Sequence, residues 1–329
     1  MITTSSTVVI GRNEGARLKL CLDTLFAQAG KIVYVDSGST DDSVAYANLL
    51  GIEVVQLDMS TPFSAGRARN EGFHHALARW PETEAVQFID GDCELEKGWL
   101  TQAKKHLETN SSWAIVAGRV KERYPENSVY NLLCDIEWDT PLGTIDSCGG
   151  IFMIKTQAFI NMGGFNTQVI AGEEPELCYR LRQHNWEIHR VSSPMAMHDA
   201  NISKFSQWWQ RCIRSGHAYA QGVKIHGKNI HGYCVKDSLR IWYWSVILPF
   251  FILLLTLWLS PFFLFLFPLV YFTQLAKITI VTNKHLDNWA HSFTYAFYNI
   301  IGKWPQLIGQ LLFLRRILLD KKFSIIEYH

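Results

Sequence analysis

Residues 85–92 read Ala-Val-Gln-Phe-Ile-Asp-Gly-Asp, a short apolar run that ends in two carboxylates one residue apart. The run predicts a strand over Ala85–Ile89 that ends at Asp90. Earlier segments repeat the pattern of a β-branched run, loop residues and a helical stretch. The expected strands cover Thr7–Ile10, Ile32–Val35 and Glu53–Leu57, and the expected helices cover Arg17–Gln28, a stretch ending at Leu50, and Ser64–Arg79. This alternation predicts an α/β fold with a Rossmann-like, mostly parallel sheet.

Ligands of such sheets bind at the carboxyl ends of the strands, where the polar clusters of this sequence fall. Asp90 and Asp92 end one strand, and Asp36 ends another strand 54 residues earlier. Paired carboxylates at a strand end can hold Mg²⁺ or Mn²⁺ together with phosphate oxygens. Two solvated carboxylates in a turn are the alternative, but the strand context favours a metal site. We expect Asp36 to bind a nucleotide, whereas Thr40 and Asp41 suit helix capping.

The net charge of +1 hides a strong asymmetry along the chain. Residues 1–200 contain 17 basic and 26 acidic side chains, residues 201–240 contain 7 and 1, and residues 241–329 contain 7 and 3. An acidic body without a basic stripe argues against a nucleic-acid partner. The seven cysteines include no Cys-x-x-Cys pair, so we expect a reducing compartment and no zinc site. The first residues lack the features of a signal peptide, which predicts a cytosolic polar domain.

From residue 98 to 194 the pattern is less regular. It suggests a hairpin-like stretch over Gly149–Ile154, a turn at Gly163–Phe165, a helix over Pro175–His184 and a strand over Ile188–Val191.

Six motifs then occur in order. They are Val9–Glu14 (Val-Ile-Gly-Arg-Asn-Glu), Asp36–Asp41 (Asp-Ser-Gly-Ser-Thr-Asp), Gly66–Gly72 (Gly-Arg-Ala-Arg-Asn-Glu-Gly), Phe88–Asp92, Gly163–Phe165 and Gly172–Leu177 (Gly-Glu-Glu-Pro-Glu-Leu). In order and spacing, residues 7 to about 222 resemble family 2 glycosyltransferases. The resemblance implies a GT-A fold, a nucleotide-diphospho-sugar donor, a divalent cation (Mg²⁺ or Mn²⁺) held by the Asp-x-Asp, and inversion at the sugar carbon.

The resemblance also implies roles for single residues. Glu174 matches the catalytic base, with Glu173 beside it, although glutamates in a first helical turn also complement the helix dipole. His198 matches a further metal ligand of some members; a structural histidine is the alternative. The expected nucleotide-sugar-binding residues are Asp36, Asn13, Glu14, Arg69, Asn70, Asp90, Arg211 and Arg214. Arg211 and Arg214 could clamp the diphosphate, or lie on an interfacial helix with Trp208 and Trp209.

The segment Ile241–Ala276 contains 36 residues without Asp, Glu, Lys or Arg. As one helix it would reach ~54 Å, whereas the hydrocarbon core is ~30 Å thick. Pro261 divides it into two expected spans, about 242–259 and 262–280, which form a transmembrane hairpin over 241–281 with basic residues on both flanks. A shallow re-entrant hairpin is the alternative. Residues 226–240 form a basic juxtamembrane linker, and residues 282–329 an interfacial amphipathic tail with a break at Pro305.

The sequence therefore predicts a GT-A catalytic domain over residues 1–225, anchored to the cytoplasmic face of the inner membrane. The expected activity is non-processive, inverting transfer of a sugar to a hydroxyl or phosphate of a lipid-linked or other membrane-associated acceptor, in cell-surface polysaccharide or glycolipid synthesis. Membrane lipids are expected partners, and the hypothesis allows a homo-oligomer. The alternatives are a membrane-anchored nucleotidyltransferase, for which Gly11–Gly15 is a poor phosphate loop, and a non-catalytic scaffold.

Overall fold

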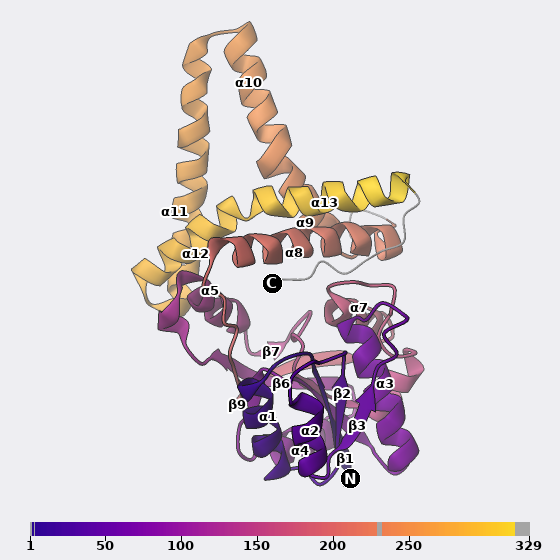
Figure 1. Cartoon of the computed structure of the whole chain (residues 1–329). Coiled ribbons are helices and arrows are strands. Elements are labelled where there is room, and N and C mark those ends of the chain that lie inside the picture. Colours follow the sequence, from indigo (N-terminus) through magenta and orange to yellow (C-terminus); the bar gives the residue numbers. More distant parts are fainter. Residues whose placement is uncertain (1, 3, 229–231, 320–329) are drawn as a thin grey trace. The chain divides into compact units, whose positions relative to one another are not determined.

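The computed structural model describes residues 2, 4–228 and 232–319 (Figure 1). The chain divides into two compact units. The first unit comprises Met1–Pro125 and Glu137–Asn201, and the second comprises Glu126–Ile136 and Ile202–His329. The expected catalytic-domain boundary at residue 225 stays a prediction; by packing, residues 202–225 belong to the second unit.

Within the described residues, the first unit contains a nine-stranded sheet in the order β3-β2-β1-β4-β8-β6-β9-β5, with β7 beside β9. Strands β3, β2, β1 and β4 are parallel, as are β6 and β9, whereas β8 runs antiparallel between β4 and β6. Most paired residues lie in parallel ladders, so the expected fold class is confirmed. The strands are β1 (Ser5–Gly11), β2 (Ile32–Asp36), β3 (Glu53–Gln56), β4 (Ala85–Asp90), β5 (Cys93–Leu95), β6 (Trp113–Glu122), β7 (Gly143–Thr144), β8 (Phe152–Lys155) and β9 (Glu187–His198).

The helices of the first unit pack on this sheet. Helix α3 contacts β1 and β2, and α4 contacts β6 and β8. Gly72 permits the close contact of α3 with β1 and β2, because an added Cβ at this position would lie 2.4 Å from Val8 and 2.7 Å from Val35. The helices are α1 (Ala16–Phe26), α2 (Ser43–Leu49), α3 (Ala65–Arg79, with the Ser64 side chain as N-cap), α4 (Trp99–Thr109), α6 (Thr156–Asn161) and α7 (Glu173–Gln183).

The parallel register brings the predicted carboxylates to one edge of the sheet. Strand β1 pairs Gly11 with Asp36 of β2 and Ile10 with Asp90 of β4. Asp36 and Asp90 therefore end the two strands that flank β1.

Two strands differ from the sequence prediction. The hairpin-like stretch at Gly149–Ile154 contributes an interior strand, β8, because Phe152, Met153 and Ile154 are buried on both faces of the sheet. Strand β9 extends to His198, beyond the predicted end at Val191. It accommodates Pro194 at an irregularity in the ladder with β6, where a missing N–H is tolerated.

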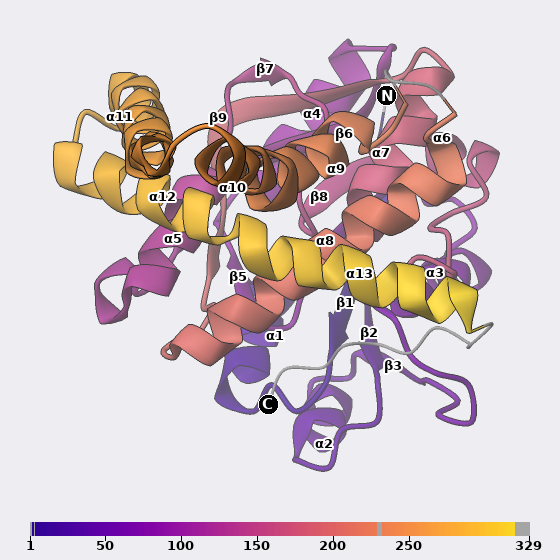
Figure 2. The ribbon, with the colours of Figure 1, turned by 90° about the horizontal axis from the view of Figure 1, so that it is seen from above.

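The second unit is helical in its described part (Figure 2). Helices α8 and α13 lie side by side. They approach closely at two glycines, since a Cβ on Gly216 would lie 1.9 Å from the Gln306 carbonyl oxygen, and one on Gly309 would lie 2.0 Å from that of Ile213. The elements are η1 (Pro125–Asn127) and α5 (Val129–Trp138) at its boundary with the first unit, α8 (Phe205–His226), α9 (Val235–Trp242), the π-helical η2 (Tyr243–Ile247), α10 (Leu248–Trp258), η3 (Pro261–Phe265), α11 (Leu266–Leu286), α12 (Trp289–Ile301) and α13 (Lys303–Leu318).

The uncharged segment Ile241–Ala276 lies within two helices that are long and apolar enough to cross a membrane, Val235–Trp258 and Pro261–Leu286. Figure 1 shows α10 and α11 as an antiparallel pair joined by a short turn. Ser260 lies between the two helices in the sequence, and its hydroxyl accepts a hydrogen bond from the Phe262 N–H. The predicted break before Pro261 is thus present. The first helix begins at Val235, inside the expected linker 226–240, of which residues 229–231 lie outside the described part.

The tail differs from the prediction in one respect. The two tail helices meet at Gly302, whereas Pro305 lies within the first turn of α13. The first turn of a helix has no intrahelical partners for its N–H groups, so a proline there breaks nothing. Residues 320–329, including Lys321 and Lys322 of the predicted basic flank, lie outside the described residues.

Candidate active site

The ends of β4 and β9 bring Asp90, Asp92 and His198 together. The short strand β5 pairs Cys93 with His198. The His198 Nε2 atom lies 3.4 Å from Oδ2 of Asp92, and its Nδ1 atom lies 3.5 Å from Oε2 of Glu122. Burial lowers the pKa of His198, but the Asp92 and Glu122 carboxylates outweigh it, so the pKa is raised. This Glu122–His198–Asp92 chain orients the imidazole toward the end of β4.

The residues around Asp92 fit a divalent cation. Burial, together with the charge of Asp92, raises the pKa of Glu14 to about 7. Arg17 pairs with Glu14 at 2.6 Å and opposes this effect only in part. A cation among Asp92, Asp90 and His198 would offset the mutual repulsion of these carboxylates, and the oxygen-plus-imidazole donor set suits Mn²⁺ or Mg²⁺.

Arg69 of α3 joins this cluster to the head of α7. Its buried guanidinium donates to Oδ1 of Asp90 at 2.6 Å and to Oε1 of Glu173 at 2.7 Å. Burial lowers the pKa of Arg69, but the two carboxylates outweigh it and raise the pKa above its ordinary value. Asp90 and Glu173, both predicted site residues, are therefore bound by the two terminal nitrogens of the same guanidinium group. The predicted sugar-binding role of Arg69 stays a prediction, and its observed partners are these two acids.

Glu174 lies beneath the loop that precedes β8. Its side chain is 4% exposed, and Oε1 accepts hydrogen bonds from the Cys148 N–H at 2.7 Å and from the thiols of Cys148 and Cys178 at 3.1 and 2.9 Å. Burial raises the pKa of Glu174, and these hydrogen bonds oppose the rise. The two adjacent glutamates therefore have different environments: an arginine for Glu173, and two thiols and an amide for Glu174.

The loops after β1 and β2 are tied together at the other side of the site. The Asn13 N–H donates to the Ser39 hydroxyl at 2.9 Å, and the Asn13 side chain accepts from the Thr40 N–H at 2.7 Å. Asp36 is 3% exposed. It accepts hydrogen bonds from the Tyr34 hydroxyl and from the amides of residues 38 and 39. Asp36 thus shapes the loop, and its contact with a nucleotide stays a prediction.

Asn70 has a structural partner. Its amide donates to the Phe165 carbonyl at 2.8 Å and accepts from the Phe165 N–H at 2.9 Å, which fixes the predicted turn at Gly163–Phe165. Arg211 and Arg214 lie on α8 in the second unit, where Arg211 contacts the thiol of Cys134. Their predicted binding of the diphosphate remains untested.

Sequence reasoning missed Glu122, Cys148 and Cys178. Glu122 ends β6, and the rule that singled out Asp36 and Asp90, a carboxylate at a strand end, would have found it. Cys148 and Cys178 are 30 residues apart, and no local spacing connects them.

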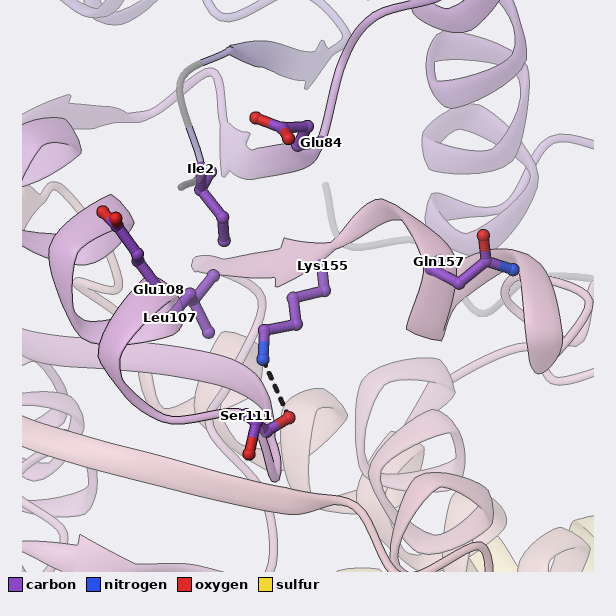
Figure 3. A pocket seen from close by; sticks show the side chains of 7 residues that line it. All are labelled: Ile2, Glu84, Leu107, Glu108, Ser111, Lys155 and Gln157. Atoms are coloured by element: carbon purple, nitrogen blue, oxygen red, sulfur yellow. Dashed lines mark hydrogen bonds between the residues drawn. The ribbon is translucent and has the colours of Figure 1, made fainter.

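A cavity of about 320 Å³ lies at the opposite end of the sheet (Figure 3). Lys155 enters it from the end of β8 and donates to the carbonyls of Asn110 and Ser111 at 2.9 Å. Lys155 pairs with Ala85, the first residue of β4, whereas Asp90 is the last residue of that strand. The cavity is therefore remote from Asp90. Its lining is formed by Ile2, Glu84, Leu107, Glu108, Ser111, Lys155 and Gln157.

Comparison with protein-family models gives two matches. Residues 6–161 match "Glycosyl transferase family 2", and residues 135–204 match "N-terminal domain of galactosyltransferase". No curated protein matches the chain in sequence. The family match confirms the resemblance carried by the six motifs.

Solved structures confirm the GT-A fold. A mannosyltransferase from Pyrobaculum calidifontis, solved with GDP-Man and Mn²⁺, has a TM-score of 0.56 at 16% identity, covering 90% of this chain and 86% of the other. Residues 1–349 of S. aureus TarS have a TM-score of 0.53 at 13% identity, covering 97% and 92%. Against a longer TarS structure the TM-score is 0.46 at 15% identity, and the match covers 67% of this chain and 44% of TarS.

Proposed function

Because residues 6–161 match family 2 glycosyltransferases and the first unit has the GT-A fold, we propose that this chain is an inverting glycosyltransferase. It moves a sugar from a nucleotide-diphospho-sugar to a hydroxyl or phosphate of a membrane-associated acceptor. The observation that carries the proposal is the Arg69 bridge, which holds the Asp-x-Asp strand end and the acidic head of α7 together.

Asp92, Asp90 and His198 would hold Mg²⁺ or Mn²⁺, and Glu122, 3.5 Å from Nδ1 of His198, would orient the imidazole. When bound, the cation neutralises charge on the diphosphate leaving group. The mannosyltransferase with GDP-Man and Mn²⁺ supports this choice of donor and cation. Asn13, Glu14 and Asp36 shape the nucleotide side of the site.

Glu174 is the general base that removes the proton from the acceptor hydroxyl. A buried carboxylate with a raised pKa suits that task near neutral pH, because it binds a proton more strongly than an exposed one. Glu173 is a weaker candidate because Arg69 holds it in an ion pair. Glu173 instead anchors the head of α7 to Asp90.

The acceptor is membrane-associated, and the enzyme works at the cytoplasmic face of the inner membrane. The support is the outward apolar surface of the two long helices, on which Phe250, Phe251, Trp258, Phe262 and Phe272 are exposed. Two spans do not enclose a polymer channel, so the enzyme transfers one or a few sugars to a lipid-linked acceptor rather than extending a polymer processively.

The test measures turnover of a panel of nucleotide-sugars by membranes that contain the full chain, with and without Mn²⁺ or Mg²⁺. We expect cation-dependent turnover of one donor, and a loss of about 10²-fold or more in Asp92→Asn and Glu174→Gln. Glu108→Gln is the matched control, because Glu108 is an exposed glutamate at the far end of the sheet. Full activity in either site variant would contradict the mechanism. A larger loss in Glu173→Gln than in Glu174→Gln would exchange the roles of the two glutamates.

A further inference from the structure

Two thiols that the transfer reaction does not require form a cluster with the proposed base, Glu174. Glu174 and Cys178 lie one turn apart on α7, on the same face of the helix, and Cys148 comes from the loop before β8. The Oε1 atom of Glu174 lies 3.1 Å from the Cys148 sulfur and 2.9 Å from the Cys178 sulfur, and the two sulfurs are 4.0 Å apart.

Contrary to the expectation of no zinc site that the cysteine spacing gave, we propose that Cys148, Glu174 and Cys178 bind a thiophilic divalent cation such as Zn²⁺, and that this cation inhibits the enzyme. Tetrahedral zinc holds thiolate sulfur at ~2.3 Å and carboxylate oxygen at ~2.0–2.2 Å, which places neighbouring ligand atoms about 3.5–3.8 Å apart. The sulfur–oxygen separations of 3.1 and 2.9 Å are about 0.4–0.6 Å shorter than this range and the sulfur–sulfur separation of 4.0 Å is about 0.2 Å longer, so small side-chain shifts would bring the three atoms to it. Two thiolates, one carboxylate oxygen and a water complete four-coordination.

The surroundings distinguish this cluster from ordinary core cysteines. A buried thiol usually packs as a small apolar side chain. Here both thiols instead point at one carboxylate oxygen that is itself buried. Cys148 is only partly buried and is followed by two glycines, of which Gly149 has φ of +87°. Cys148 is therefore the member of the cluster that solvent reaches.

The cluster and the Asp-x-Asp site select different cations. Oxygen ligands suit Mg²⁺ and Mn²⁺, whereas two sulfur ligands favour Zn²⁺ and similar soft cations. The inhibitory part of the proposal rests on the proposed function, because a cation on Oε1 of Glu174 would occupy the carboxylate that must accept the acceptor's proton.

Cobalt substitution in the purified full chain tests the site without any activity measurement. Co²⁺ bound by thiolates shows a sulfur-to-cobalt charge-transfer band in the near ultraviolet. We expect this band in the wild type and in Cys93→Ser, and its loss in Cys148→Ser and Cys178→Ser. Cys93→Ser is the essential control, because the thiol of Cys93 lies beside Asp92 and His198. Absence of the band in the wild type, or its loss only in Cys93→Ser, would overturn the proposed site.

A second measurement needs no variant and therefore does not depend on the folding of one. Zn²⁺ should protect Cys148 from alkylation in the wild-type protein, as read by peptide mass spectrometry, whereas Mn²⁺ should not. Equal alkylation of Cys148 with either cation would count against the site.

Inhibition is tested at saturating Mn²⁺. Zn²⁺ should reduce turnover of the wild type, and Cys148→Ser should need at least about tenfold more Zn²⁺ for the same reduction, as expected when a ligand is lost. Equal inhibition of both proteins would refute the inhibitory role. The cobalt band would still show whether Cys148 and Cys178 bind a cation. If no nucleotide-sugar is turned over at all, the proposed function fails, and the cobalt and alkylation results stand on their own.

Discussion

Gly150 occupies a position where a single methyl group would meet two charged side chains. A Cβ at this position would lie 2.8 Å from both the Nη2 atom of Arg69 and the Oδ2 atom of Asp90. We predict that Gly150→Ala separates this ion pair or moves the loop, which reduces turnover at least about tenfold and lowers the free energy of unfolding by about 1–3 kcal/mol. Gly30→Ala is the control, since its added Cβ meets nothing within 4 Å. Unchanged turnover in Gly150→Ala would contradict the role given to the Arg69–Asp90 contact.

A second prediction concerns His217, which is 1% exposed and packs edge-on against Phe313. Burial, with a smaller effect from the Arg316 charge, lowers the pKa of His217 to about 4. The unfolded chain therefore binds a proton at higher pH than the folded chain does. As the pH falls from ~6.5 toward ~4, the free energy of unfolding should fall by up to ~1.4 kcal/mol per pH unit from this group.

Thermal unfolding of the solubilised protein at about pH 7 and about pH 5 measures this effect. The wild type should lose more stability between the two values than His217→Gln. The exposed His291 provides the control, so His291→Gln should keep the pH dependence of the wild type. An equal loss in the wild type and His217→Gln would show that His217 is not the responsible group.

Among single residues, the sequence allowed prediction of the site residues that lie at the ends of strands. Asp36 and Asp90 lie where the alternation of strands and helices places them, because parallel strands end at one edge of the sheet. The three contacts of Glu174 were not predictable, since they depend on the path of the loop before β8. That path is set by tertiary packing rather than by local sequence.

The helices of the second unit depend on close approach between backbones. Gly309 of α13 and Gly216 of α8 each face a backbone carbonyl of the opposite helix at a distance that leaves no room for a Cβ. Gly309→Ala should therefore force α8 and α13 apart, lowering the thermal midpoint of the solubilised protein by several degrees through a loss of about 1–3 kcal/mol. Gly30→Ala again serves as the control, and an unchanged midpoint in Gly309→Ala would show that the two helices can separate without cost.

Elements were predicted well where a run of residues had one clear period, and less well where neighbouring strands decided the outcome. The helix after Ser64 and the break before Pro261 follow from capping and proline chemistry. Strand β8 was mistaken for part of a hairpin because its two partners, β4 and β6, are far from it in the sequence. Pro305 was expected to break a helix, yet it lies in the first turn of α13. The break itself falls at Gly302, between α12 and α13.

For the whole molecule, the central question is on which side of a membrane the turn between the two long helices lies. Tyr271 of α11 donates to the carbonyl of Trp244 in the π-helical turn, so the two long helices contact each other about midway along their lengths. If both helices cross the bilayer, Ser260→Cys in a cysteine-free background should react with an impermeant maleimide only from the side opposite the first unit. Asn288→Cys, which follows α11, should react from the same side as the first unit.

Reaction of both positions from the side of the first unit would indicate a re-entrant hairpin instead. The sequence predicted the two helices from composition and from one proline, but it could not choose between these arrangements. Apolar side chains are exposed on both helices in either case.

The division of the chain into units constrains how a soluble enzyme could be engineered. Residues 126–136 interrupt the first unit and pack in the second, so the backbone passes between the two units three times. Tyr130 stacks with Trp208 and packs edge-on against Tyr298, and Leu133 is 2% exposed. Truncation after Asn201 would therefore leave an apolar helix without its partners and produce an aggregation-prone fragment. Solubilisation requires replacing residues 126–136 as well, with a short polar connection from Pro125 to Glu137.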